Sequence, residues 1–158
     1  MRSLVVYYSR TGNAQFVAEK IASELKADTE EVVDLKNRRG WLSFLRAGYD
    51  ATRSKETKIG KMQKLPKDYD LIVIGTPVWN SRLTPAIRTY LKDNDLSGKK
   101  VAIFSTNEGR GNGKTLAMIK SLIPGGNIVG ELGVSKALEN QEETESKISA
   151  WCNNLKSI

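Results

Sequence analysis

The sequence contains no histidine, a single cysteine and only four prolines among its 158 residues. Histidine is the commonest metal ligand and the usual general base of catalytic triads, so its absence argues against a zinc site and against such a triad. The one cysteine, Cys152, cannot form an internal disulfide. We therefore expect no metal site and no disulfide framework.

Long hydrophobic runs are also missing. No apolar stretch is long enough to span a bilayer, and Arg2 leads directly into a short apolar segment rather than into a cleavable signal sequence. A chain of this length can bury a sufficient core without disulfides. We expect one domain over residues 1–158, in the cytoplasm, without a transmembrane segment.

Acidic residues are fewer than basic ones, 18 against 25, which gives a net charge of +7. Such an excess favours an acidic partner protein, nucleic acid or an anionic membrane face. Many of the basic residues lie between positions 36 and 67, in a single connecting segment. They do not lie along a helix of the size that binds in a groove of nucleic acid. We therefore expect acidic partners and no nucleic acid.

Apolar segments alternate with helical patterns along the chain. Strands are predicted at residues 4–8, 29–34, 71–75, 101–104 and 127–134, and helices at residues 14–25, from 85 to 91, at 116–123 and at 148–155, the last with Cys152 on its apolar face. Short, continuously apolar strands are typical of parallel sheets that helices cover on both faces. The second and fifth strands are the weakest, which favours the edges. The alternation predicts an α/β fold, doubly wound, with a five-stranded parallel sheet in the order 2-1-3-4-5.

The connection at residues 36–70 is unusually long. Trp41 and Tyr49 belong to an apolar stripe at helical spacing with arginines around it. Such a stripe covers the sheet in most proteins, whereas a basic amphipathic helix can also dock on a membrane or a partner. Residues 51–67 carry little apolar material and read as an exposed loop.

The first strand runs into a helix through Ser9-Arg10-Thr11-Gly12-Asn13-Ala14. Backbone N–H groups at a helix N-terminus lack partners and favour an anion, and the hydroxyls add further donors. Gly12 lets the backbone approach a ligand closely. The loop therefore indicates a phosphate site, although a plain helix-capping turn has the same residues.

The loop after the third strand is Thr76-Pro77-Val78-Trp79-Asn80, followed by a helix with Thr84 as its cap and Pro85 at its first position. Polar neighbours flank Trp79, so its ring can stack on a planar ligand or fold over its own helix. Asn80 is the residue of this loop best suited to a positive φ.

The fourth strand ends in a glycine-rich loop, residues 105–115, that resembles a nucleoside-triphosphate loop in its Gly-Lys-Thr ending. That motif requires a glycine where this chain has Glu108, and a carboxylate there repels a polyphosphate. We interpret the loop instead as one that shapes around the edge of a ligand.

The Ser-x-Thr-Gly-Asn pattern and the two later loops resemble the flavodoxin family over nearly the whole chain. Ala14 departs from the family, which usually has a hydroxyl residue there. The resemblance implies that FMN binds where the loops after strands one, three and four meet, at the point where the strand order reverses. Flavodoxin is itself a known example of ligand binding at such a point.

The resemblance implies three groups of cofactor-binding residues: Ser9, Arg10, Thr11, Gly12, Asn13 and Ala14 for the phosphate; Thr76, Pro77, Val78, Trp79 and Asn80 for one side of the ring; and Thr106, Asn107, Glu108, Gly109 and Gly111 for the other side and the pyrimidine edge. The family often stacks a second aromatic from the fourth-strand loop, which this loop lacks, and Trp41 or Tyr49 is a candidate for that face.

The resemblance implies flavin redox chemistry and leaves three functions open. The first is an electron carrier that docks to redox proteins with acidic surfaces. The second is an enzyme acting on a quinone or a porphyrinogen, since the Arg-rich segment resembles the protoporphyrinogen-oxidase-type relatives. The third is a flavin-free docking module. The carrier is the function that we predict.

Overall fold

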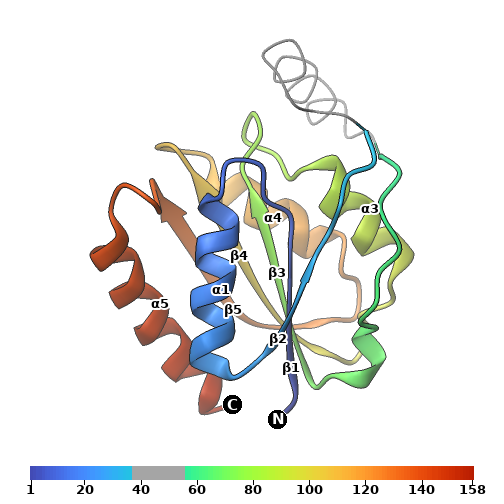
Figure 1. Cartoon of the computed structure of the whole chain (residues 1–158). Coiled ribbons are helices and arrows are strands. Elements are labelled where there is room, and N and C mark those ends of the chain that lie inside the picture. The colour runs from blue at the N-terminus through green and yellow to red at the C-terminus, as the bar shows by residue number, and fades with distance from the viewer. Residues whose placement is uncertain (37–55) are drawn as a thin grey trace.

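The computed structural model describes residues 1–36 and 56–158 of the chain (Figure 1). The helix expected around Trp41 and Tyr49, and the candidate cover for the second ring face, lie outside the described residues. Within the described part, no helix is long and apolar enough to cross a membrane.

Five strands form one sheet. They are β1 (Ser3–Tyr7), β2 (Asp28–Glu31), β3 (Leu71–Pro77), β4 (Lys100–Asn107) and β5 (Asn127–Ser135). Every neighbouring pair is parallel, and the order is β2-β1-β3-β4-β5, as predicted. The helices of the described residues are α1 (Asn13–Leu25), α3 (Pro85–Asp93), α4 (Asn112–Ser121) and α5 (Gln141–Lys156), with a short 3-10 turn at Pro66–Asp68.

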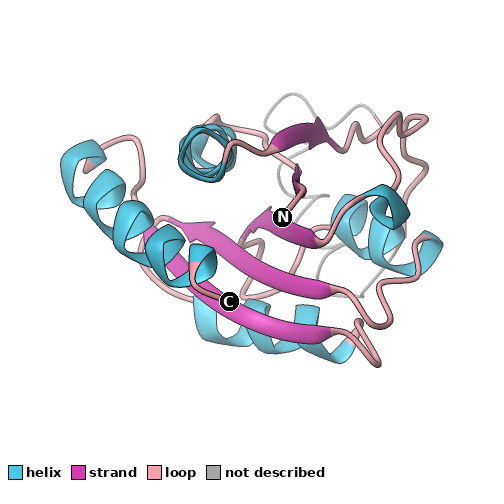
Figure 2. Ribbon diagram, turned by 90° about the horizontal axis from the view of Figure 1, so that it is seen from below, coloured by secondary structure: helices cyan, strands magenta, loops and turns pink. Residues whose placement is uncertain are grey.

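The helices cover both faces of the sheet (Figure 2). Alternate residues of each central strand point to opposite faces, because the side-chain period of a strand is two. Leu4 and Val6 therefore join the core under α3 and α4, whereas Val5 joins the core under α1 and α5. Cys152 is fully buried in the second core, as its place in the apolar stripe predicts.

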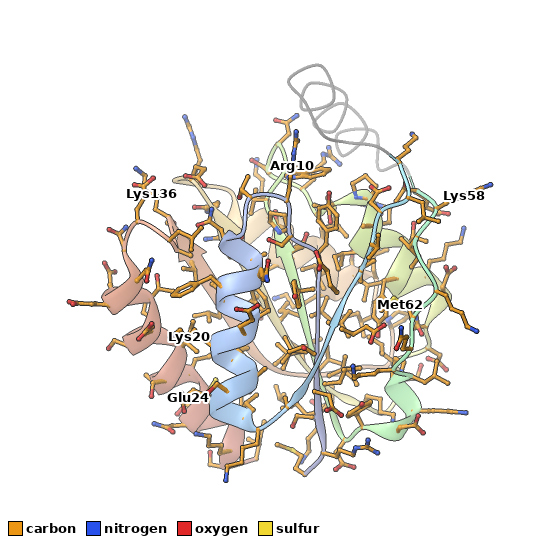
Figure 3. All side chains as sticks on the ribbon, viewed as in Figure 1. Arg10, Lys20, Glu24, Lys58, Met62 and Lys136 are labelled. Atoms are coloured by element: carbon orange, nitrogen blue, oxygen red, sulfur yellow. The ribbon has the colours of Figure 1, made fainter. Side chains whose placement is uncertain are left out.

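The second strand is shorter than expected, because the chain leaves the parallel sheet after Glu31. Val33 is 54% exposed, and Asp34 forms an isolated antiparallel bridge with Ile59. The described part of the expected exposed loop thus runs along the β2 edge. Ile59 and Met62 pack against the core, while Lys58 extends outward in Figure 3.

The central strands β3 and β4 extend past their apolar runs. Thr76, Ser105 and Thr106 are almost completely buried, and each is among the last residues of a strand rather than in a loop. Side chains with hydroxyl groups can enter the sheet interior where they find partners: Thr76 Oγ1 lies 3.1 Å from Thr84 Oγ1, and Ser105 Oγ donates to Asn112 Oδ1 at 2.6 Å. This polar layer lies directly beneath the loops at the carboxyl edge of the sheet.

Candidate functional site

The carboxyl ends of β1, β3 and β4 meet at one edge of the sheet, and the loops that follow them enclose a cavity of about 460 Å³. Its lining comes from all three loops: Arg10, Thr11, Asn13, Pro77, Val78, Trp79, Asn80, Ser81, Thr106, Asn107, Glu108, Gly109 and Arg110. The structure therefore brings the three predicted groups of residues together. Ser81 and Arg110 are additions that the sequence interpretation missed, although both directly adjoin predicted residues.

Five of the predicted residues do not line the cavity: Ser9, Gly12, Ala14, Thr76 and Gly111. Ser9 Oγ accepts a hydrogen bond from Gln15 N at 3.2 Å and so orients the loop against the first turn of α1. Ala14 is 1% exposed within the core beneath α1. Its methyl group packs where the family usually has a hydroxyl.

The first loop places the N-terminus of α1 at the cavity. Gly12 is the cap residue, with φ of 92°, a conformation that glycine adopts without strain. The first turn of α1 contains no acidic residue, so no carboxylate from the helix itself opposes the positive end of its dipole. The arrangement suits a phosphate or another anion.

Asn13 links this loop to two others. Its Nδ2 donates to Thr11 Oγ1 at 3.2 Å and to Glu108 Oε1 at 3.4 Å, and its Oδ1 accepts from Leu138 N at 3.1 Å. The loop after β5 is further tied to the site by Lys136 N, which donates to Asn107 O at 2.7 Å. Asn13 thus joins segments that lie 95 and 125 residues away in the sequence.

The loop after β3 closes in a two-residue turn. Trp79 and Arg82 exchange backbone hydrogen bonds of 2.9 and 3.0 Å, and the residues between them, Asn80 and Ser81, have φ of 50° and 58°. Positive φ at both central positions is the geometry of the tight turn that best fits a twisted hairpin. Asn80, the residue of this loop best suited to a positive φ, has that conformation, and so does Ser81.

Trp79 both packs on the core and lines the cavity. Its ring meets Tyr8 edge to face, with 5.5 Å between ring centroids, and the Arg10 guanidinium carbon lies 5.8 Å from the Trp79 ring centroid. Trp79 thus lies between the core and the cavity, and its ring contacts Tyr8 and Arg10. Of the described residues that line the cavity, Trp79 is the one aromatic.

Gly111 holds the second and third loops in contact. Its φ is 100°, and a Cβ there would lie 2.8 Å from Val78 Cγ1 and 3.3 Å from Ser81 Cα. A side chain at this position would separate the two loops. Gly111 therefore shapes the cavity from behind its wall.

Thr106 is 2% exposed, and its Oγ1 has no hydrogen-bond partner in the part of the chain that the structure describes. A buried hydroxyl without a partner costs free energy, and this one belongs to a residue that lines the cavity. A ligand with a polar edge would satisfy it. The lining also contains two guanidinium groups, Arg10 and Arg110, against one carboxylate, Glu108, which favours an anionic ligand.

A cavity at the switch point of a doubly wound parallel sheet defines a class of α/β proteins that bind their ligands outside the carboxyl ends of the strands. The sequence model of one family within this class, described as flavodoxin, matches residues 2–155. The chain belongs to the flavodoxin family.

Solved structures resemble this one over nearly the whole chain. A flavoprotein from Lactobacillus acidophilus, solved in complex with FMN, is 25% identical with a TM-score of 0.75, covering 95% of this chain and 97% of its own. A flavoprotein from Bacteroides uniformis is 22% identical with a TM-score of 0.80, over 92% and 96% of the two chains. Oxidised flavodoxin 2 from Bacillus cereus is 20% identical with a TM-score of 0.68, over 99% of each. At these low identities, the similarity to the last two structures shows a common fold.

Proposed function

We propose that this protein is an FMN-binding electron carrier that docks to redox proteins through a basic surface. The observation that carries the proposal is the cavity of about 460 Å³, which has the N-terminus of α1 on one side and the Trp79 ring on another. An anion site and an aromatic surface in one cavity suit a phosphorylated aromatic ligand. The similar Lactobacillus flavoprotein is in complex with FMN, which supports this choice of ligand.

The phosphate end of FMN is assigned to the loop of Ser9, Arg10, Thr11, Gly12 and Asn13. The first amides of α1 and the Thr11 hydroxyl would donate to the phosphate oxygens, while Arg10 would add a positive charge. Ala14 contributes packing rather than a hydroxyl. The fit thus depends more on backbone amides than on side chains.

The ring end is assigned to the two later loops. Trp79 provides an apolar surface, and the close approach of Val78 to Gly111 holds the two loops together behind the cavity wall. Thr106 Oγ1, together with the loop of Asn107 and Gly109, would hold the polar edge of the ring. FMN, when bound, supplies the reversible acceptance of electrons, which no side chain of the cavity provides.

FMN, if bound and reduced, would carry an added N–H group that requires a hydrogen-bond acceptor near the ring. We assign this acceptor to a backbone carbonyl of the loop after β3, between Thr76 and Ser81. The two hydrogen bonds between Trp79 and Arg82 fix the turn around Asn80. The chain thereby holds its acceptor in place rather than recruiting it from solvent.

The docking surface is assigned to the rim of the cavity. Arg82 follows the turn that lines the cavity, Arg110 lines it, and Lys114 lies in the first turns of α4. Partners with acidic docking sites would meet complementary charge there, which accelerates encounter at low salt.

The test is the visible spectrum of the purified protein with and without added FMN, followed by stepwise anaerobic reduction. We expect a bound flavin and two resolved one-electron steps, and slow oxidation of nicotinamide cofactors in the absence of a partner. Rapid reduction of a quinone, or oxidation of a porphyrinogen, by the protein alone would replace the carrier with an FMN-dependent oxidoreductase. Absence of flavin binding would overturn both.

A further inference from the structure

A second cavity, of about 520 Å³, lies between α3 and α4 at the end of the helices that points away from the loops of the first cavity. Its lining residues are Glu56, Arg88, Leu91, Lys92, Asn94, Asp95, Leu96, Ser121, Leu122, Ile123 and Pro124. None of them lines the cavity assigned to FMN. The proposed function leaves this space without a role.

The apolar part of the cavity is continuous with the core. Leu91, Leu96 and Ile123 are at most 5% exposed and belong to the core beneath α3 and α4, and Leu122 packs against that core. These side chains form an aliphatic wall. A cavity of this size is within the range that holds small organic ligands.

The Arg88 guanidinium on this wall is half-buried and poorly satisfied. Among the described residues its hydrogen bond goes to a thioether, from Nη2 to Met118 Sδ at 3.1 Å, although a guanidinium carries five donors. Burial lowers the pKa of Arg88, with a further lowering from Arg82 and an opposing effect of Glu56. A cation in this condition gains from an anionic partner.

The carboxylates of the cavity have partners other than Arg88, and the partner of Glu56, Lys92, also lines the cavity. Both Glu56 oxygens accept from Lys92 Nζ at 3.0 Å, and Asp95 Oδ1 accepts from Ser97 N and Oγ at 2.9 and 2.6 Å. Neither forms an ion pair with Arg88 in the part of the chain that the structure describes. The carbonyls at the end of α4 are likewise capped, since Leu122 N donates to Ile119 O and Ile123 N donates to Lys120 O.

We infer that this cavity binds a small amphiphilic carboxylate, with the acid group on Arg88 and an aliphatic chain against Leu91, Leu122 and Ile123. Planar guanidinium and carboxylate groups can form two parallel hydrogen bonds, which gives the contact a defined orientation. The aliphatic wall then excludes water from the chain of the ligand. This site is independent of FMN and stands whether or not the first cavity holds a flavin.

Octanoate is the probe, and amide NMR spectra of the purified protein give the readout. Saturable shifts are expected at the amides of Leu91, Leu122 and Ile123, with dissociation at about the millimolar level or tighter. Octan-1-ol, which lacks the charge, and acetate, which lacks the chain, should each bind at least tenfold more weakly.

The variant Arg88→Met keeps an unbranched aliphatic stem but removes the guanidinium, and it should weaken octanoate binding at least tenfold. Lys120→Gln is the matched control, because it removes one positive charge from α4 at a residue whose Nζ pairs with Glu131 at 2.9 Å. This control should bind octanoate as the natural protein does. Shifts confined to the first cavity, no saturable shift, or equal binding by Arg88→Met would overturn the inference.

Discussion

Asn13 Nδ2 lies 3.4 Å from Glu108 Oε1, so the first residue of α1 reaches a loop that follows β4, 95 residues later in the sequence. The same side chain contacts Thr11 and the backbone of Leu138. The loops after β1, β4 and β5 are therefore hydrogen-bonded to the same side-chain amide. We therefore expect the shape of the cavity to depend on this amide.

Replacing Asn13 by alanine tests this link. Each lost hydrogen bond costs about 1 kcal/mol, so Asn13→Ala should lower the free energy of unfolding by about 1–2 kcal/mol and weaken FMN about tenfold. Urea unfolding and flavin fluorescence titration measure the two effects. Asn153→Ala, on the exposed side of α5, is the control and should change neither. Unaltered FMN affinity in Asn13→Ala would show that the amide does not shape the site.

Thr106→Val separates binding from stability. The Thr106 hydroxyl has no partner among the described residues, so its removal should leave the flavin-free protein as stable as before or slightly more stable. FMN binding should weaken about tenfold, since the ligand is the partner that we assign to this hydroxyl. Thr115→Val is the matched control, because Thr115 Oγ1 is also buried without a described partner but does not line the cavity. Equal FMN affinities in the two variants would contradict the assignment.

Gly75 has no room for a side chain. A Cβ there would lie 2.0 Å from Phe104 Cζ, on the neighbouring strand β4. Gly75→Ala should therefore lower the free energy of unfolding by about 3 kcal/mol, which urea denaturation measures. Gly113→Ala, on the open side of α4, should instead stabilise by up to about 1 kcal/mol, because alanine is the better helix former. If the first variant were neutral, the packing of Phe104 against β3 would be wrong.

Arg10 and Arg110 should set the reduction potential of the bound flavin. Fully reduced FMN carries negative charge, which nearby cations stabilise. Neutralising either arginine with glutamine should lower the final one-electron potential by about 60 mV, equivalent to about tenfold in the equilibrium constant. Lys147→Gln, on α5, should leave the potential unchanged. A very low final potential in the natural protein would contradict the electrostatic argument.

Stability should fall at alkaline pH. Burial raises the pKa of the Cys152 thiol to about 12, with a further increase from Glu24 and an opposing effect of Lys156, whereas an unfolded thiol ionises near 8.5. Above about pH 8.5 the unfolded state loses the thiol proton first, so the free energy of unfolding decreases as the pH rises toward 12. Burial also raises the pKa values of Tyr69 and Tyr90, which extends the loss above pH 10.

Urea unfolding between pH 8 and 10 measures this dependence. Cys152→Ala should show a shallower decrease, because the residue that ionises only in the unfolded state is gone. The folded natural protein should also resist thiol reagents at pH 8 and react with them once unfolded. An identical pH dependence in the variant would assign the loss to other groups.

The local pattern of apolar residues was sufficient to predict the strands of the sheet and their order. The continuously apolar residues of β3 and β4 can be satisfied only with helices on both faces, and the weaker second and fifth strands belong at the edges. The sequence also indicated Asn80 as the residue suited to a positive φ, since asparagine tolerates that conformation. In these cases the relevant chemistry lies within a few residues.

Other features depend on segments that meet only in three dimensions. The end of β2 at Glu31 could not be read from its sequence, because the pairing of Asp34 with Ile59 withdraws the chain from the parallel sheet. Ser81 lines the cavity because the turn after β3 folds back toward it. Ala14 does not line the cavity, because its methyl group packs into the core.

The sequence by itself determined that this chain is a doubly wound α/β protein with three polar loops at one edge, because strand character, helix period and loop chemistry are local properties. Only the tertiary structure decided which side chains of those loops face a common space. It also decided that the Asn13 amide joins the loops after β1, β4 and β5, and that Arg88 lies beside an aliphatic wall with a thioether as its hydrogen-bond partner. Such relationships arise from packing between distant segments, which no local pattern encodes.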